Sequence, residues 1–259
     1  MKISALFARL MLITSAAAFG ATTATADTGQ LTVKVDQPGV KISPILHGLM
    51  TEEINYSYDG GLYGELIRNR IFKDSPSEPA RWKLVDSDDA KGKIELDTKD
   101  PVNSAALTVS LRLDISGVGA GKRVGVANEG YWGIPVRPNT TYRASFYAKG
   151  SDDFKGPLTA SIESNDGKEV AATASVPEIS REWKKYELKL KTGDVPESST
   201  NRFVISAANS GSVWFSLVSL FPPTFNDRPN GNRIDIMNLL KEMRPQFLRF
   251  PGGNYLEGN

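Results

Sequence analysis

The sequence contains no cysteine and only one histidine, His47. Without thiols the chain can form neither a disulfide nor a zinc–thiolate site, and it has no cysteine nucleophile. One histidine also argues against a multi-histidine metal site or a Ser-His-Asp triad within these residues. His47 lies in an apolar run, which favours a packed core histidine over a catalyst. We therefore expect no cofactor, no metal site built from thiolates or several histidines, and a fold stabilised by buried apolar area. A calcium ion bound by oxygen ligands stays open, although no acidic loop shows clear ligand spacing.

An excess of either charge is also absent. The 31 Lys and Arg residues nearly balance the 30 Asp and Glu residues, for a formal net charge of +1. No basic patch with interleaved aromatic residues offsets this balance. The composition therefore indicates no nucleic-acid partner and no binding to an acidic membrane.

Residues 1–26 are typical of a secretory signal peptide. Lys2 and Arg9 supply the positive charge, residues 10–19 are apolar or small, and a small-x-small cleavage signature ends at Ala26. The apolar run is shorter than the roughly 20 residues that cross a membrane. We expect cleavage near Ala26 and a secreted or periplasmic mature protein.

Residues 27–75 are expected to hold an N-terminal strand followed by one βα unit. Alternation over 31–35 predicts the first strand, and the apolar run 45–50 predicts a second. A polar cluster with two glutamates follows at 51–55, which is how barrel strands present active-site residues at their carboxyl ends. Apolar residues within 62–71 recur at helical spacing and predict an amphipathic helix.

Residues 76–222 have a different texture. Short β-type runs are separated by Gly, Asn, Asp and Pro, which is typical of an antiparallel sandwich. The runs lie at 106–113, 123–127, 141–148, 158–164, 183–190, 203–207 and 212–220. We therefore predict a jelly-roll-like β-sandwich over 76–222.

The helical period returns in residues 223–259. One apolar face is formed by Ile236, Leu239, Leu240 and Met243. Pro245 ends this helix, and a strand follows at 247–250. The two α/β pieces are too small to bury their own faces, because an eight-stranded barrel typically needs about 250 residues. The predicted fold class is α/β plus all-β: the beginning of a (β/α)8 barrel, interrupted by the sandwich and incomplete. A chain that stops just past a strand is expected to be an N-terminal piece of a larger enzyme.

Four strings carry a family resemblance: HGLMTEEIN at 47–55, GGLYGELIRNR at 60–70, RPNG at 228–231 and FLRFPGGN at 247–254. They resemble glycoside hydrolase family 51, the α-L-arabinofuranosidases. The sandwich is similar to the carbohydrate-binding-module-like domain inserted in secreted members. Its most typical runs are 130–136 and 142–149.

The resemblance implies a retaining (β/α)8 hydrolase of L-arabinose metabolism. Such an enzyme removes terminal non-reducing α-L-arabinofuranosyl residues from arabinose-containing polysaccharides or oligosaccharides. In the family two glutamates on later barrel strands, about 5 Å apart, do the chemistry. No stretch of this chain matches either segment, so no catalytic residue is assigned here.

The resemblance does assign two substrate-binding residues. Glu52 matches the glutamate that hydrogen-bonds the arabinofuranose after the first barrel strand, and Asn254 matches the amide after Pro-Gly-Gly. A carboxylate and an amide can together read donor and acceptor hydroxyls. Glu53 should point to the opposite side of the strand and act as a structural partner. Glu257 fits helix capping equally well.

Two other classes of function stay open. Trp132 is the best candidate for stacking on a sugar ring, because an indole face is a flat apolar platform. Trp183 and Trp214 lie in alternating strands and are expected in the core. The alternative to the hydrolase is therefore a non-catalytic protein, either a carbohydrate-binding β-sandwich or a structural one that supports the barrel.

Overall fold

The computed structural model describes residues 29–252, except 38, 87–89, 104 and 119–120. The chain forms two compact units, Met1–Ser43 and Pro44–Asn259. The predicted signal peptide, Asn254 and Glu257 lie outside the described residues.

In the first unit the predicted strand at 31–35 does not form. The described residues of this unit contain neither helix nor strand, and Leu31, Val33 and Val35 are exposed. Alternation alone does not make a strand, because its N–H and C=O groups need a neighbouring strand as partner. No described segment supplies one here.

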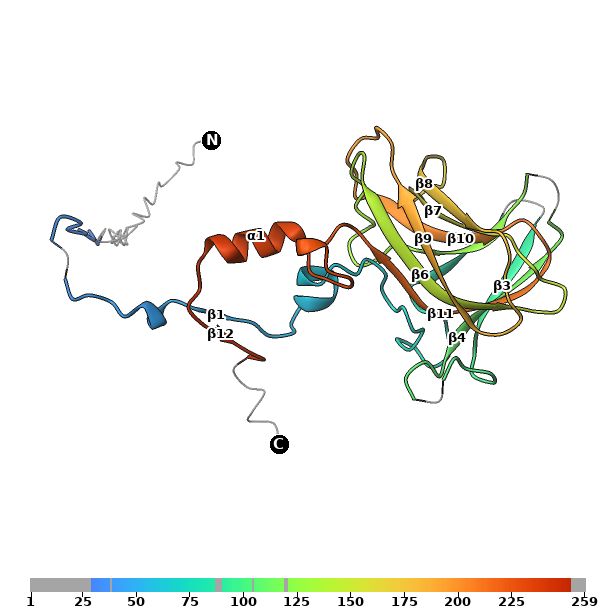
Figure 1. Cartoon of the computed structure of the whole chain (residues 1–259), viewed down its shortest axis with the longest axis horizontal. Helices are drawn as coiled ribbons and strands as arrows, with labels where there is room; N and C mark the ends of the chain where they lie inside the picture. Colours follow the sequence, from blue (N-terminus) through green and yellow to red (C-terminus); the bar gives the residue numbers. More distant parts are fainter. Residues whose placement is uncertain (1–28, 38, 87–89, 104, 119–120, 253–259) are drawn as a thin grey trace, which may run out of the picture. The chain divides into compact units, whose positions relative to one another are not determined.

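The second unit contains two five-stranded antiparallel sheets that pack into a β-sandwich (Figure 1). In spatial order the first sheet consists of β2 (Trp82–Val85), β5 (Val124–Asn128), β10 (Asn201–Ala207), β7 (Leu158–Ser164) and β8 (Val170–Val176). The second consists of β3 (Lys91–Asp97), β4 (Ser110–Ser116), β11 (Gly211–Phe221), β6 (Thr141–Gly150) and β9 (Lys184–Lys191). The predicted sandwich is confirmed.

The core between the sheets follows the strand period of two. In β6 the buried apolar residues Tyr142, Ala144, Phe146 and Ala148 alternate with more exposed ones. Phe146 meets Phe215 of β11 edge to face, with ring centroids 6.0 Å apart. Each fully buried side chain of this size contributes roughly 1.5–3 kcal/mol of hydrophobic stabilisation.

The helix predicted over 62–71 is wrong. A single π-helical turn at Tyr58–Leu62 is followed by irregular backbone. The Leu66 N–H donates to a carbonyl of β11, 2.9 Å away, so the segment pairs with the sandwich rather than with itself. Ile67 and Phe72 are fully buried in the sandwich core. The helix-like spacing therefore comes from contacts with the core.

One buried carboxylate fixes this segment, which we call the latch segment (residues 63–72), to the sandwich. Glu65, 2% exposed, accepts hydrogen bonds from the N–H groups of Ile67 at 3.0 Å and Leu220 at 2.9 Å. The Ser219 hydroxyl donates to it at 2.5 Å, and the Arg70 guanidinium lies 3.3 Å away. Burial raises the pKa of Glu65, against the lowering effects of Arg70 and the hydrogen bonds.

The remaining elements are short. They are the 3-10 turns at Pro44–Leu46 and Phe225–Asp227, α1 (Ile234–Glu242), β1 (Leu49–Met50) and β12 (Leu248–Arg249). The helix predicted after the sandwich is thus present, and the strands predicted at 45–50 and 247–250 form over two residues each. No helix in the described part of the chain is long and apolar enough to cross a membrane. The (β/α)8 barrel itself stays a prediction.

Candidate functional site

The two short parallel strands bring together a segment that precedes the sandwich and one that follows it. Leu49 pairs with Leu248 and Met50 with Arg249, and the Thr51 N–H donates to the Arg249 carbonyl at 3.1 Å. In a parallel pair both carboxyl ends lie at the same edge. The residues after β1 and those after β12 therefore share one edge.

Glu52 lies directly against Gly252 at this edge. A Cβ placed on Gly252 would lie 2.7 Å from the Glu52 Cβ and would also meet its carboxylate. Gly252 also has a φ of +127°, which side chains other than glycine rarely adopt. Only glycine therefore leaves room for Glu52 in this geometry. The segment that holds Glu52 is next to the one that leads to Asn254, which lies outside the described residues.

The two adjacent glutamates have different surroundings. Glu53 accepts a hydrogen bond from the Tyr58 N–H at 2.9 Å, so it holds the local turn, as expected of a structural partner. Within the described chain the half-buried Glu52 carboxylate has no hydrogen-bond or ion-pair partner. Its backbone carbonyl accepts hydrogen bonds from the Ser57 hydroxyl and the Ile54 N–H. Glu52 is therefore positioned by its backbone while its carboxylate can still bind a ligand.

An aromatic cluster adjoins the turn that follows Glu52. The rings of Tyr56 and Trp132 meet edge to face with their centroids 6.0 Å apart, and those of Tyr56 and Tyr131 are tilted by 60° with their centroids 5.6 Å apart. Arg68 donates to the Tyr56 hydroxyl at 2.7 Å and lies 4.7 Å from its ring centroid. Burial, followed by the charges of Asp59 and Glu65, raises the pKa of Tyr131 to about 12. Its phenol is therefore neutral at any physiological pH.

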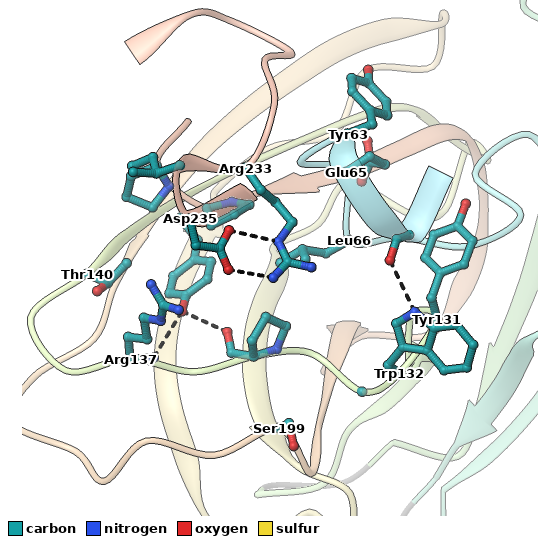
Figure 2. A pocket seen from close by; sticks show the side chains of 17 residues that line it. Tyr63, Glu65, Leu66, Tyr131, Trp132, Arg137, Thr140, Ser199, Arg233 and Asp235 are labelled. Atoms are coloured by element: carbon teal, nitrogen blue, oxygen red, sulfur yellow. Dashed lines mark hydrogen bonds and ion pairs between the residues drawn. The ribbon is translucent and has the colours of Figure 1, made fainter. Parts of the chain in front are cut away.

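A cavity of about 320 Å³ lies between this cluster and the start of α1 (Figure 2). Tyr131 and Trp132 line one side, and Tyr63 and several prolines also line the cavity. Arg233 and Asp235 line another side and form a bidentate pair, with N···O distances of 3.1 and 2.6 Å. The cavity thus combines aromatic faces with a polar fork.

Two other tryptophans contradict their expected place. Trp183 and Trp214 are half-buried on the outer surface of the second sheet, not in the core. Lys149 lies between them, 5.3 and 5.0 Å from the two ring centroids. Trp214 pairs with Arg112 and Lys149 on the adjacent strands, so its position in β11 faces outward. The alternating sequence pattern predicts the strand correctly but does not tell which of its two faces is buried.

His47 also differs from its expected environment. It is exposed, and its backbone carbonyl accepts a hydrogen bond from the Gln246 N–H at 2.8 Å. Its contribution to the described structure is thus through the backbone, beside β12. Among the described residues no three His, Cys, Asp or Glu side chains gather into a group that could hold a metal ion.

Comparison with known proteins shows which families and proteins resemble this chain. Residues 64–211 match the family model of a carbohydrate binding domain. Probable α-L-arabinofuranosidase A of Aspergillus terreus is 38% identical over 226 residues, which cover 85% of this chain and 35% of that protein. α-L-Arabinofuranosidase 1 of Arabidopsis thaliana is 31% identical over 241 residues, which cover 88% of this chain and 34% of that protein.

A solved structure gives the same result. The arabinose-bound MgGH51 α-L-arabinofuranosidase is 38% identical, with a TM-score of 0.73 over 85% of this chain and 36% of that one. The chain spans about 35% of the length of the curated relatives it matches. The resemblance to family 51 α-L-arabinofuranosidases is confirmed, and over residues 64–211 the chain belongs to the carbohydrate binding domain family.

Proposed function

We propose that the chain is part of a secreted, retaining α-L-arabinofuranosidase that removes terminal non-reducing α-L-arabinofuranosyl residues from arabinose-containing polysaccharides. The observation that carries this proposal is the parallel pair β1–β12, which brings the Glu52 side chain next to Gly252. The named relatives, which match 85% of this chain, support it.

At this edge the residues would bind the arabinofuranosyl group rather than cleave it. The Glu52 carboxylate can only accept hydrogen bonds, so sugar hydroxyls would donate hydrogen bonds to it, whereas the Asn254 amide both donates and accepts. Gly252 lets the backbone approach the sugar closely. Retention needs a nucleophile and an acid/base about 5–5.5 Å apart. We assign neither role to Glu52 or to Glu257.

Exposed apolar side chains support a larger protein around this edge. Leu239 of α1, Leu248 of β12 and Phe250 are all exposed in the described structure. A run of exposed apolar residues on neighbouring elements indicates a surface that another element covers. We propose that later barrel elements cover it, and that the protein is exported after cleavage near Ala26.

The gene itself tests this proposal. We expect the reading frame to continue past codon 259 for some hundreds of residues and to supply the two catalytic glutamates. The protein from that frame should release L-arabinose from 4-nitrophenyl α-L-arabinofuranoside and from arabinoxylan. A stop codon after Asn259, or a complete protein without this activity, would contradict the proposal.

A second candidate is a non-catalytic carbohydrate-binding protein. The match of residues 64–211 to a carbohydrate binding domain and the 68% exposure of Trp132 favour it. It predicts retention of the chain on arabinoxylan together with a frame that encodes no catalytic glutamates. A purely structural sandwich predicts no retention on any polysaccharide.

A further inference from the structure

Trp132 is an exposed ring that is nevertheless held in one place. It is 68% exposed, whereas the core residue Trp82 is 5% exposed. Its indole N–H donates to the Gly60 carbonyl at 3.1 Å, and its ring meets Tyr56 edge to face. Leaving so much apolar surface in water is unfavourable. A fixed and exposed indole face is what an aromatic platform for a ligand requires.

The sandwich loop that carries Trp132 is bound to the turn that follows Glu52. Gly60 has a φ of +82°, and a Cβ there would lie 2.5 Å from the Tyr131 ring, so the two segments approach closely. In the same turn the Ser57 hydroxyl donates to the Glu52 carbonyl. Although far apart in sequence, Trp132 and Glu52 are therefore linked by one short turn.

The cavity beside Trp132 has the composition of a sugar site. Its volume of about 320 Å³ is at the lower end of the range of about 300–1,000 Å³ for small-ligand pockets. Figure 2 shows Tyr131 and Trp132 on one side and the Arg233–Asp235 pair across from them. Aromatic rings suit the C–H faces of a sugar, and a paired guanidinium and carboxylate can donate to and accept from its hydroxyls. Because these two charges are already paired, the site suits a neutral sugar.

We propose that Trp132 and this cavity form a second carbohydrate subsite, which binds backbone sugars of the polysaccharide that carries the terminal arabinofuranosyl residue. The subsite rests on the proposed function, because it assigns the Glu52 edge to the arabinofuranosyl group. The sandwich would then select polymeric substrates by holding the chain next to the edge where its side group binds.

Binding to the 259-residue chain is the first test. Calorimetric titration with an arabinoxylan oligosaccharide should show binding that Trp132→Ala weakens by about tenfold, the loss expected for one stacked aromatic ring. Trp132→Phe, which keeps a ring, should retain most of the affinity. Trp183→Ala removes a half-buried tryptophan from the outer surface of the second sheet and should change nothing. Absence of binding, or equal loss in both alanine variants, would overturn the proposal.

Kinetics of the enzyme from the complete reading frame are the second test. Trp132→Ala should lower kcat/KM on arabinoxylan about tenfold more than it lowers kcat/KM on 4-nitrophenyl α-L-arabinofuranoside, because the small substrate does not reach the subsite. Equal loss on both substrates, or no loss on either, would refute the subsite. If the wild-type enzyme hydrolyses neither substrate, the proposed function fails, and the titration alone decides whether the cavity binds sugar.

Discussion

Replacement of Glu65 by alanine should release the latch segment from the sandwich. The substitution leaves the buried N–H groups of Ile67 and Leu220 without their acceptor, at a cost of about 1–3 kcal/mol each. It also removes the acceptor of Ser219 and the ion-pair partner of Arg70. We expect a loss of about 3–5 kcal/mol in the free energy of unfolding, as for other buried ion pairs that lose one partner.

Urea unfolding of the chain, followed by tryptophan fluorescence, measures this loss. Glu65→Gln is the matched control, since the amide keeps an acceptor for the two N–H groups, and it should cost less than the alanine variant. A loss below about 1 kcal/mol for Glu65→Ala would refute the inference that this carboxylate holds the segment.

Comparison of the wild type with Glu65→Gln also predicts how the free energy of unfolding depends on pH. Burial raises the pKa of Glu65 above its ordinary value of 4.5. The folded state therefore binds the proton more tightly than the unfolded state, so the contribution of this group is present below pH 4.5 and is lost as pH rises through the folded pKa. The stability of the wild type relative to Glu65→Gln should decrease over this interval. An increase would show that Arg70 outweighs burial.

Three further predictions concern single side chains. Glu52→Gln in the complete enzyme should lower kcat/KM by roughly 10- to 150-fold, the equivalent of one lost hydrogen bond to a charged group. The neighbouring control Glu53→Gln should have a much smaller effect. Similar losses of kcat/KM in the two variants would contradict the assignment of Glu52 to substrate binding. Gly252→Ala should reduce the same activity, because its Cβ would lie 2.7 Å from the Glu52 Cβ; full activity would show that the edge is not built as described. Glu163→Gln should lower the free energy of unfolding by about 3–5 kcal/mol in urea, because the fully buried carboxylate is paired with Arg123 and Arg202. A change within about 0.5 kcal/mol, as at an ordinary surface site, would contradict this.

The sandwich could be predicted because turn residues separate several short β-type runs, and because strands such as β6 alternate between buried and more exposed residues. All seven expected runs form strands; the run 158–164 has the bounds of β7, and the other six have shifted ends. The strands β2, β3 and β8 were not expected, and all three are edge strands. Edge strands are often short or charged, as β3 is, and such sequences give a weak signal.

Other features depend on contacts that local patterns do not record. The latch segment has helical spacing, but Glu65 and its partners in β11 hold it in an irregular form. Trp214 alternates like a core residue, and only its neighbours Arg112 and Lys149 show that it faces outward. The contact of Trp132 with the turn after Glu52 joins segments far apart in sequence. The sequence does contain one usable signal, the glycines on both sides of Tyr131 and Trp132.

The candidate site was predicted in part. Its location after a strand could be inferred from the Glu52 motif and the family resemblance, and the pairing of β1 with β12 places Glu52 beside Gly252. The cavity lined by Arg233 and Asp235 was not predicted, because its walls come from the sandwich and from the start of α1.

The most direct test of the central claim is a crystal structure of the complete enzyme with bound L-arabinose. We predict that a Glu52 carboxylate oxygen lies about 2.5–3.2 Å from a hydroxyl of the furanose ring, at the edge formed by β1 and β12. Arabinose bound at another place, with Glu52 out of hydrogen-bonding reach, would contradict the claim that this chain supplies the arabinofuranose-binding edge.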